Sequence, residues 1–199
     1  MLLAALALTV IAAGERAVPG DVAIGRAFQQ PPSSQLDIAA QVASNIGDEF
    51  PSMALMALVG VALLVLRGRW DLAIFLALAA ALRALGPVLK VLINSPRPTL
   101  EAVVIVAQAD GLGFPSGHAL GAALVYGAIA VIVPQVVSNR LLASVLQILA
   151  VVMMLLIAWS RVRLGVHWPS DVAGGLLYGL GLVCLVQAGR LFWQSRLRT

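Results

Sequence analysis

Long apolar runs alternate with short polar stretches along most of this chain. The apolar runs cover residues 1–13, 50–66, 70–93, 115–133, 141–161 and 169–193. A helix needs about 20 apolar residues to cross the hydrocarbon layer of a membrane, so the longer runs predict membrane helices. We predict an all-α polytopic membrane helix bundle with about six transmembrane helices.

The first run has two interpretations. Residues 1–13 are almost wholly apolar, which suits either a short transmembrane helix that continues toward Val18 or the apolar core of a cleaved signal peptide. No basic segment precedes the run, and this favours the helix. Whether the segment stays on the mature chain is left open.

A polar stretch with turn signals follows, over residues 14–32. The segment 34–37 then resembles a helix-capping box, and apolar residues recur after it at helical spacing. This pattern predicts an amphipathic helix over 34–46, placed in the extracytoplasmic membrane interface or packed on the bundle. A surface helix without a function is the alternative.

Composition supports a membrane protein. Of the 199 residues, 61% are hydrophobic and 11% are charged, so an ordinary soluble domain is excluded. The net charge is +4, but the arginines lie at predicted helix ends rather than on one basic face, and no nucleic-acid partner is expected. Cys184 is the only cysteine, which excludes a disulfide within the chain. We expect one domain over residues 1–199.

The arginines also predict an orientation, because basic residues are enriched in cytoplasmic loops. Six of them fall on one side of the predicted bundle: Arg67, Arg69, Arg140, Arg190, Arg196 and Arg198. Only Arg16 and Arg26 lie on the other side, apart from the polar segments described next. Those polar segments are therefore expected together at the extracytoplasmic face.

These segments bring positive charge to two helix N-termini. Lys90, Arg97 and Arg161 lie at or near helix ends, and helices are predicted to begin near Pro115 and Pro169. A helix N-terminus and guanidinium groups both favour oxyanions, so a phosphate ligand is indicated. Ser116 and Gly117, in the first helical turn, would add a hydroxyl and a backbone N–H. Arg163 is either a further ligand or a basic side chain that reaches to the membrane surface.

Both histidines of the chain lie in the same segments. His167 precedes Asp171 by four residues, the spacing at which a carboxylate can orient an imidazole and leave its other nitrogen free as a nucleophile. His118 is then available as the acid that protonates a leaving group. Together they indicate phosphoryl transfer through a phosphohistidine. Asp171 is the only acid in these segments, so neither a metal nor another cofactor is expected.

The three polar segments, 90–98, 115–118 and 160–171, match the three-part signature of a known family. Lys90-x6-Arg97-Pro98, Pro115-Ser116-Gly117-His118 and Ser160-Arg161-x5-His167-x3-Asp171 together resemble the type 2 phosphatidic acid phosphatase superfamily. That family includes lipid phosphate phosphatases and bacterial membrane enzymes that act on undecaprenyl pyrophosphate and phosphatidylglycerophosphate. It also includes soluble vanadium-dependent haloperoxidases, a use against which the hydrophobic runs argue.

The resemblance implies a role for each matched residue. His167 would attack phosphorus, Asp171 would activate it and His118 would protonate the leaving group. The residues implied to hold the phosphate oxygens, without a metal, are Lys90, Arg97, Ser116, Gly117 and Arg161.

We therefore expect a metal-independent phosphatase of the cell membrane, with its active site on the extracytoplasmic side. A lipid-linked phosphate or pyrophosphate is the expected substrate, and no protein partner is required. The resemblance ranks undecaprenyl pyrophosphate first, before phosphatidylglycerophosphate and phosphatidic acid. The alternatives are an anion or lipid-phosphate transporter and a binding protein without turnover.

Several neighbouring residues have simpler interpretations. Arg83 lies deep in a predicted span, so a buried partner or an interior role is expected. Ser160 is expected to bond the backbone of its own helix, and Gly174-Gly175 to allow close helix packing. Trp168 and Trp193 are expected to anchor the membrane interface.

Overall fold

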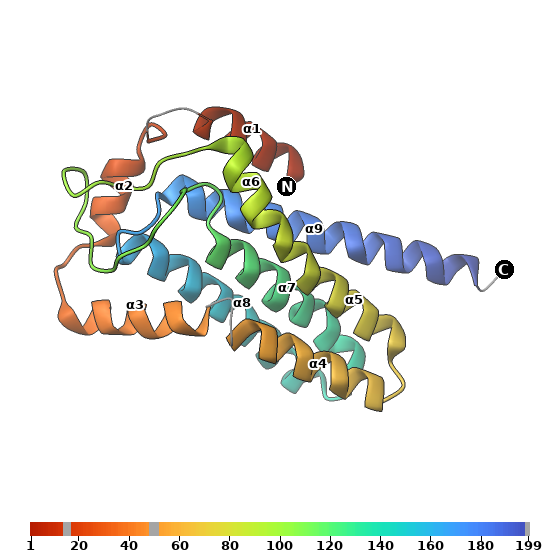
Figure 1. Ribbon diagram of the computed structural model, residues 1–199. Helices are drawn as coiled ribbons and strands as arrows, with labels where there is room; N and C mark the ends of the chain where they lie inside the picture. The colour runs from red at the N-terminus through yellow and green to blue at the C-terminus, as the bar shows by residue number, and fades with distance from the viewer. Residues whose placement is uncertain (14–16, 48–51, 198–199) are drawn as a thin grey trace.

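The computed structural model describes residues 1–13, 17–47 and 52–197, and these residues form helices and loops without a strand. The helices are α1 (Leu2–Ala12), α2 (Asp21–Phe28), α3 (Ser34–Ile46), α4 (Ala54–Leu66), α5 (Trp70–Ala81), η2 (Leu82–Ala84), α6 (Leu85–Ile93), α7 (Gly117–Val136), α8 (Arg140–Arg163) and α9 (Pro169–Arg196) (Figure 1). The predicted all-α class is confirmed.

Helix α7 is the centre of the bundle and packs most extensively against α8 and α9. Helix α4 lies against α5, α1 against α9, and α3 against α8. Two glycines let α9 approach α7 closely: a Cβ on Gly175 would lie 2.7 Å from the carbonyl oxygen of Ser116, and one on Gly179 would collide with Ala123. Close packing is thus the role of this glycine-rich stretch, as predicted.

Four helical segments of the described residues are long and apolar enough to cross a membrane: Trp70–Ile93, α7, α8 and α9. Helices α1 and α4 are apolar but shorter, with 11 and 13 residues. Helix α1 ends at Ala12, and Ala17 and Val18 are not helical, so the predicted continuation toward Val18 is wrong. The predicted start of the second span at Phe50 lies outside the described residues.

The segment Trp70–Ile93 is not one regular helix. A 3₁₀ turn, η2, separates α5 from α6. Pro87 lies just beyond it, and a proline inside a helix removes a backbone donor and clashes with the carbonyl of the residue four positions earlier, here Arg83. The tighter turn follows from that clash.

The chain between α1 and α4 holds two short helices at one end of the bundle. The amphipathic helix predicted over 34–46 is confirmed as α3, but its N-cap is Ser33, whose Oγ accepts a hydrogen bond from the Leu36 N–H at 3.3 Å. The predicted capping box is therefore wrong: the N-cap is Ser33, one residue before the predicted Ser34. Helix α2 was not predicted.

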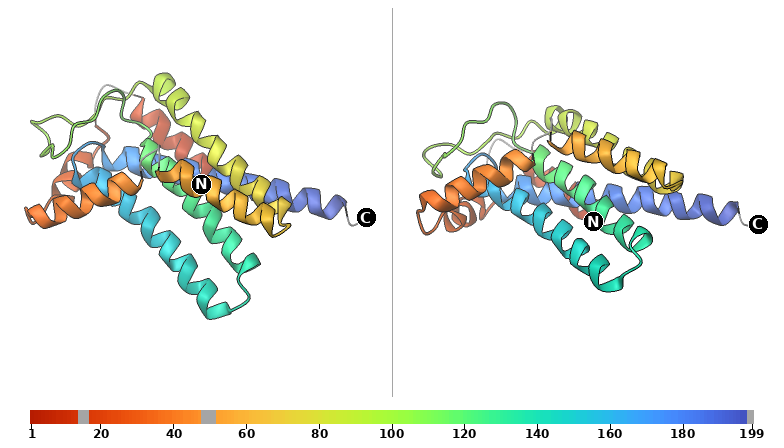
Figure 2. Two further views of the ribbon diagram at one scale, coloured as in Figure 1. Left: turned by 60° about the horizontal axis from the view of Figure 1, so that its bottom comes forward. Right: turned by 90° about the horizontal axis from the view of Figure 1, so that it is seen from below.

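The loop between α6 and α7 gathers at the same end as α2 and α3, and the C-terminus lies at the other end (Figures 1 and 2). Helix α7 begins at Gly117 with Ser116 as its N-cap, so Pro115 precedes the helix instead of opening its first turn. Helix α9 begins at Pro169, as predicted. The starts of α7 and α9 thus reach the end of the bundle where the loop and α3 lie.

Candidate active site

A cavity of about 430 Å³ lies at this end of the bundle. It receives residues from α3, α6, α7 and α8, from the α6–α7 loop and from the turn between α8 and α9. The residues that line it are Gln41, Ser44, Asn45, Lys90, Arg97, Ala107, Gln108, Ala109, Gly117, His118, Arg161 and His167. Six of the eight residues singled out in the sequence therefore line one cavity.

Lys90 reaches this cavity from the last turn of α6. Helix α6 ends at Ile93, and its C-cap Asn94 adopts a left-handed conformation with φ 53°, a region that asparagine tolerates better than most residues. The Lys90 Nζ donates to the carbonyl oxygen of Leu112 at 2.5 Å and to that of Gly113 at 3.4 Å. The ammonium group is thereby held beside the loop that leads into α7.

Arg97 is fixed by backbone carbonyls. Its Nε donates to the oxygens of Asp110 and Gly111, both at 3.1 Å, and its Nη1 donates to that of Val166 at 2.7 Å. The same Nη1 lies 3.3 Å from the Nε2 of His167. The guanidinium is therefore placed at the imidazole by the α6–α7 loop and the α8–α9 turn together.

The partners of His167 determine which of its nitrogens carries the proton. The Nδ1 lies 3.1 Å from the Oδ2 of Asp171, and an ionised carboxylate can only accept. The Nε2 lies beside Arg97, and a guanidinium can only donate. The neutral imidazole is thus protonated on Nδ1, and its Nε2 carries the lone pair that faces Arg97.

Asp171 lies behind His167, away from the cavity lining, with no exposed surface. Its Oδ2 also accepts from the backbone N–H of Trp168 at 3.0 Å, so the carboxylate caps the helix that carries it. A Cβ on Gly113 would lie 2.9 Å from that oxygen. Only a glycine fits there without moving Asp171, and Gly113 was not among the residues predicted from the sequence.

Burial and charge lower the pKa of His167 well below its usual 6.5. Burial is the larger cause, and the positive charges of Arg97, Lys90 and Arg161 add to it. Burial also lowers the pKa of Arg97, against the attraction of Asp171 and Asp110. These effects favour the unprotonated form of the His167 imidazole.

Arg161 enters the cavity from the last turn of α8 and is buried. Its Nη1 donates to the Oγ of Ser44, which lies 117 positions earlier on α3. Ser44 was not among the site residues predicted from the sequence. A polar face of α3, with Asp37, Gln41 and Ser44 at helical spacing, was the signal that could have identified it.

The start of α7 brings Gly117 and His118 to the cavity, while Ser116 lies beneath the surface. The backbone N–H of Ser116 donates to the carbonyl oxygen of Asp171 at 3.0 Å, which ties α7 to α9. The Ser116 hydroxyl is buried and has no hydrogen-bond partner among the residues that the structure describes. Ser116 is therefore the one predicted phosphate ligand that does not line the cavity.

The turn between α8 and α9 depends on Gly165, which has φ 71°. Any Cβ at this position would overlap the carbonyl oxygen of Val104, so glycine allows the α6–α7 loop to cross the turn. Trp168 also contacts the loop, through a hydrogen bond from its Nε1 to the oxygen of Pro96 at 3.2 Å. Trp168 is buried, so its predicted role as an interface anchor is wrong.

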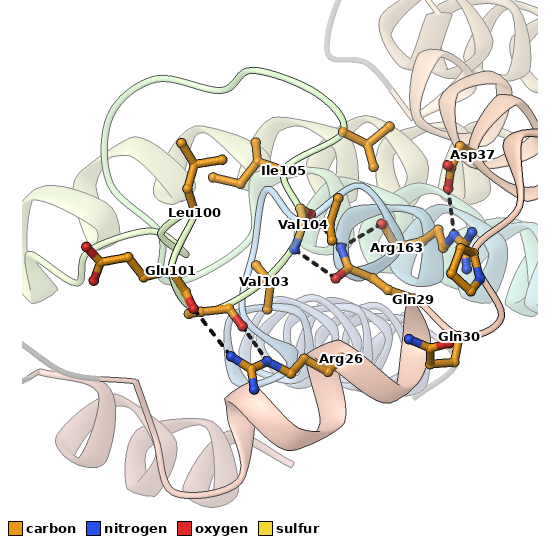
Figure 3. Close-up of a pocket in the computed structure, with 13 residues that line it drawn as sticks. Arg26, Gln29, Gln30, Asp37, Leu100, Glu101, Val103, Val104, Ile105 and Arg163 are labelled. Atoms are coloured by element: carbon orange, nitrogen blue, oxygen red, sulfur yellow. Dashed lines mark hydrogen bonds and ion pairs between the residues drawn. The ribbon is translucent and has the colours of Figure 1, made fainter.

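A second cavity, of about 570 Å³, lies between α2, α3 and residues 100–106 of the loop (Figure 3). Figure 3 shows Arg163 paired with Asp37, at 2.7 Å, on one side of it. Arg163 also donates to the carbonyl oxygens of Phe28, Pro31 and Ser33, and only 2% of it is exposed. It therefore neither reaches to the membrane surface nor lines the active-site cavity; it binds the α2–α3 segment.

Helix α2 holds the loop and the start of α9. Gln29 donates to the oxygen of Val104 at 2.6 Å and accepts from its N–H at 3.1 Å, and Arg26 donates to the oxygen of Ala102 at 2.7 Å (Figure 3). Asp21 is buried and accepts from the N–H and the hydroxyl of Ser170. The sequence pattern identified none of these contacts, because they join residues far apart in the chain.

Two further expectations can be compared with the structure. The Ser160 hydroxyl donates to the carbonyl oxygen of Ile157 in its own helix, at 2.7 Å, as predicted. Arg83 lies outside the active-site cavity, with its Nη1 3.1 Å from the Met53 Sδ and close to Gly121. An interior role for Arg83 agrees with this placement.

Among the described residues, no group of three histidine, cysteine, aspartate or glutamate side chains is placed so that it could hold a metal ion. The polar residues that line the active-site cavity carry cationic, imidazole, amide and hydroxyl groups. This set suits an anion better than a metal ion. Metal-independent chemistry remains a prediction.

Comparison with known proteins agrees with this arrangement. Residues 68–194 match the family model of the PAP2 superfamily. Phosphatidylglycerophosphatase B of Bacillus subtilis is 35% identical over 72% of this chain and 70% of its own. Decaprenylphosphoryl-5-phosphoribose phosphatase of Mycobacterium tuberculosis is 32% identical over 87% of this chain and 93% of its own.

A solved structure matches as well. The crystal structure of a transmembrane PAP2-type phosphatidylglycerolphosphate phosphatase from Bacillus subtilis superposes with a TM-score of 0.80 and 29% identity, over 94% of this chain and 92% of that one. The family model covers more than half of the chain, including every residue of the predicted signature. The chain therefore belongs to the PAP2 superfamily, among its membrane lipid phosphatases.

Proposed function

We propose that this protein removes a phosphate from a membrane lipid through a covalent phosphohistidine at His167. The observation that carries the proposal is the environment of the imidazole. Its Nδ1 faces Asp171 at 3.1 Å, and its Nε2 faces Arg97 and the cavity. A phosphate bound at Arg97 would thus lie next to the lone pair that attacks it.

Binding of the phosphate is assigned to the cationic residues of the cavity. Lys90, Arg97 and Arg161 supply positive charge, and the N-terminus of α7 supplies the N–H of Gly117. The buried Ser116 hydroxyl is a further donor in this proposal, within the same N-terminal turn. These donors would hold the three oxygens that gain charge as the phosphoryl group is transferred.

The reaction has two steps. The Nε2 of His167 forms a bond to phosphorus while the bond to the leaving oxygen breaks, and His118 gives that oxygen a proton. Asp171 accepts from the Nδ1–H and stabilises the positive charge that the imidazole gains. In the second step His118 takes a proton from water, the water oxygen attacks phosphorus, and His167 leaves as a neutral imidazole with inorganic phosphate.

The substrate is a lipid that carries a terminal phosphate or pyrophosphate. The order expected from the sequence is undecaprenyl pyrophosphate, then phosphatidylglycerophosphate, then phosphatidic acid. Similarity to a phosphatidylglycerophosphatase and to a decaprenylphosphoryl-5-phosphoribose phosphatase supports a lipid-borne phosphate. The positive-inside tendency supports a reaction at the extracytoplasmic surface.

Release of inorganic phosphate in detergent, with EDTA present, tests the mechanism. Wild type should hydrolyse at least one of the three lipids, and His167→Ala should reduce the rate by at least about a thousandfold. Gln35→Ala, an exposed change on α3 outside the cavity, is the control for expression and purification of the variants. A histidine-bound phosphate, stable to alkali and labile to acid, should be trapped during turnover of wild type.

Other outcomes would contradict the mechanism. Equal turnover by His167→Ala would exclude the histidine as nucleophile, and a requirement for added magnesium would contradict metal independence. Lipid phosphate binding without release would favour the alternatives, a transporter or a binding protein.

A further inference from the structure

The active-site cavity has a second group of lining residues that the proposed mechanism does not use. Gln41, Ser44 and Asn45 come from α3, and Ala107, Gln108 and Ala109 come from the α6–α7 loop. None of these six side chains is charged. The Ser44 hydroxyl is engaged by Arg161, whereas Gln41, Asn45 and Gln108 are exposed. This part of the cavity therefore offers neutral amide groups.

Gln41 and Asn45 act as a pair, because they lie four residues apart on one helical face. The Nε2 of Gln41 donates to the Oδ1 of Asn45 at 2.9 Å. This bond leaves the Oε1 of Gln41 as an acceptor and the amide N–H groups of Asn45 as donors. If both amides were rotated by half a turn the roles would be exchanged, yet the pair would still offer one carbonyl oxygen and one NH₂ group.

That combination fits a hydroxyl group better than a phosphate. A hydroxyl both donates and accepts, so it can bond the carbonyl and the NH₂ together. A phosphate only accepts when ionised, and the amide carbonyl would repel its oxygens. The phosphate has stronger donors in Lys90, Arg97 and Arg161 of the same cavity.

We propose that Gln41 and Asn45 form a subsite for hydroxyl groups on the moiety that carries the terminal phosphate. The subsite would select lipids with a phosphorylated glycerol or sugar headgroup over phosphatidic acid, whose phosphate is attached directly to the diacylglycerol. This inference rests on the proposed function, since it places the scissile phosphate at His167. It extends that function by assigning the choice of headgroup to α3.

The test compares two lipids that differ by one hydroxyl. One is phosphatidylglycerophosphate, and the other is its analogue with propane-1,3-diol in place of the terminal glycerol. Because only the hydroxylated lipid can form this neutral hydrogen bond, wild type should prefer it by about three- to tenfold in kcat/KM. Gln41→Met and Asn45→Leu, singly and together, should abolish the preference by lowering kcat/KM on the hydroxylated lipid more than on the analogue.

Gln35→Met is the matched control. Gln35 lies on the same helix and bonds Ser33 at 3.1 Å, but it does not line the cavity, so the preference should persist in this variant. Absence of the preference in wild type would overturn the inference, whatever the variants do. A preference that survives both substitutions, or equal losses on both lipids, would overturn it too.

Failure of the proposed function has a different signature. In that case wild type would release no phosphate from any of the lipids, or His167→Ala would release it at the wild-type rate. Hydrolysis of both matched lipids at equal rates would instead leave the phosphatase intact and remove only the headgroup subsite.

Discussion

The cations around His167 act on two groups at once. In the proposed mechanism Arg97, Lys90 and Arg161 attract the phosphate. The same charges help to lower the pKa of the imidazole well below 6.5, after burial as the larger cause. A histidine in solution is partly protonated near neutral pH, and a protonated nitrogen cannot attack. The lowered pKa would therefore keep the proposed nucleophile unprotonated at the pH where the cavity is expected to bind an anion.

A pH profile tests this coupling. The acid limb of kcat/KM reports the free enzyme, so in wild type the part due to His167 should lie below pH 6.5. Arg97→Met removes a positive neighbour, raises the pKa of His167 and should move the limb to higher pH. The ionisation of the substrate is the same for both proteins, so the difference between their limbs belongs to the enzyme.

Arg140→Met, an exposed change at the other end of α8, is the control and should leave the limb in place. An acid limb that does not move in Arg97→Met would show that Arg97 does not set the protonation of His167.

The lowered pKa of His167 also predicts how the stability of the protein depends on pH. A histidine whose pKa is lowered by folding contributes its full stability above pH 6.5, and that contribution is lost as the pH falls from 6.5 toward the lowered value.

Helices α2 and α3 show what a sequence pattern can and cannot reveal at the scale of an element. Helix α3 has 13 residues with a clear apolar period, and it was predicted. Helix α2 has eight residues that include Gly25, too few to establish a period. It is held by distant partners instead: Asp21 by Ser170, and Gln29 by Val104. Contacts of that kind become visible only when the chain is folded.

Arg163 should be the main attachment of this segment to the bundle. Its guanidinium pairs with Asp37 and bonds three carbonyl oxygens between α2 and α3. Arg163→Met keeps the apolar stem but leaves those oxygens and the carboxylate without their partner. We expect the free energy of unfolding to fall by about 1–3 kcal/mol, because these acceptors lose their donor while the Asp37 carboxylate stays partly exposed to water.

The measurement is the midpoint of thermal unfolding in detergent, followed by tryptophan fluorescence, together with protease sensitivity of the segment between α1 and α4. Arg140→Met again serves as the control, because it removes an exposed arginine from the other end of the same helix. Lipid phosphatase activity should fall as well, since α3 supplies Ser44 to Arg161. An unchanged midpoint would mean that other contacts hold α2 and α3 in place.

At the scale of the whole molecule, the sequence predicted which helix ends meet but not how they are joined. The spacing of apolar runs and the positions of basic residues placed Lys90, His118 and His167 at one end, and one cavity contains all three. The predicted count of six spans is not confirmed, because α1 and α4 are short for a full crossing. A helix ends where the chain turns, and apolar composition alone does not reveal that position.

The opposite end of the bundle has a polar cluster of its own, which joins α5, α7 and α9. Asp71 accepts from the Arg190 Nη1 at 2.5 Å and from Gln194 at 2.9 Å, and Arg190 donates through Nη2 to the Gln135 Oε1 at 2.7 Å. Arg69 adds a bond to the carbonyl oxygen of Gln135 at 2.7 Å. Gln135 lies 18 residues beyond Gly117 on α7, so about 27 Å of helix separates this cluster from the cavity.

That separation predicts that stability and activity can be changed independently. Arg190→Met should lower the free energy of unfolding by about 1–3 kcal/mol. It removes the donor to the Gln135 amide oxygen and one of the two donors to the half-buried Asp71 carboxylate, which keeps its bond from Gln194. The kcat/KM per folded molecule should stay within about twofold of wild type, since no residue of the cavity is touched. Thermal unfolding and phosphate release on the same preparation measure both quantities, and Arg67→Met, an exposed change at the same end, is the control. A loss of kcat/KM in Arg190→Met at a temperature where the protein is folded would show instead that the two ends of the bundle are coupled through α7 and α9.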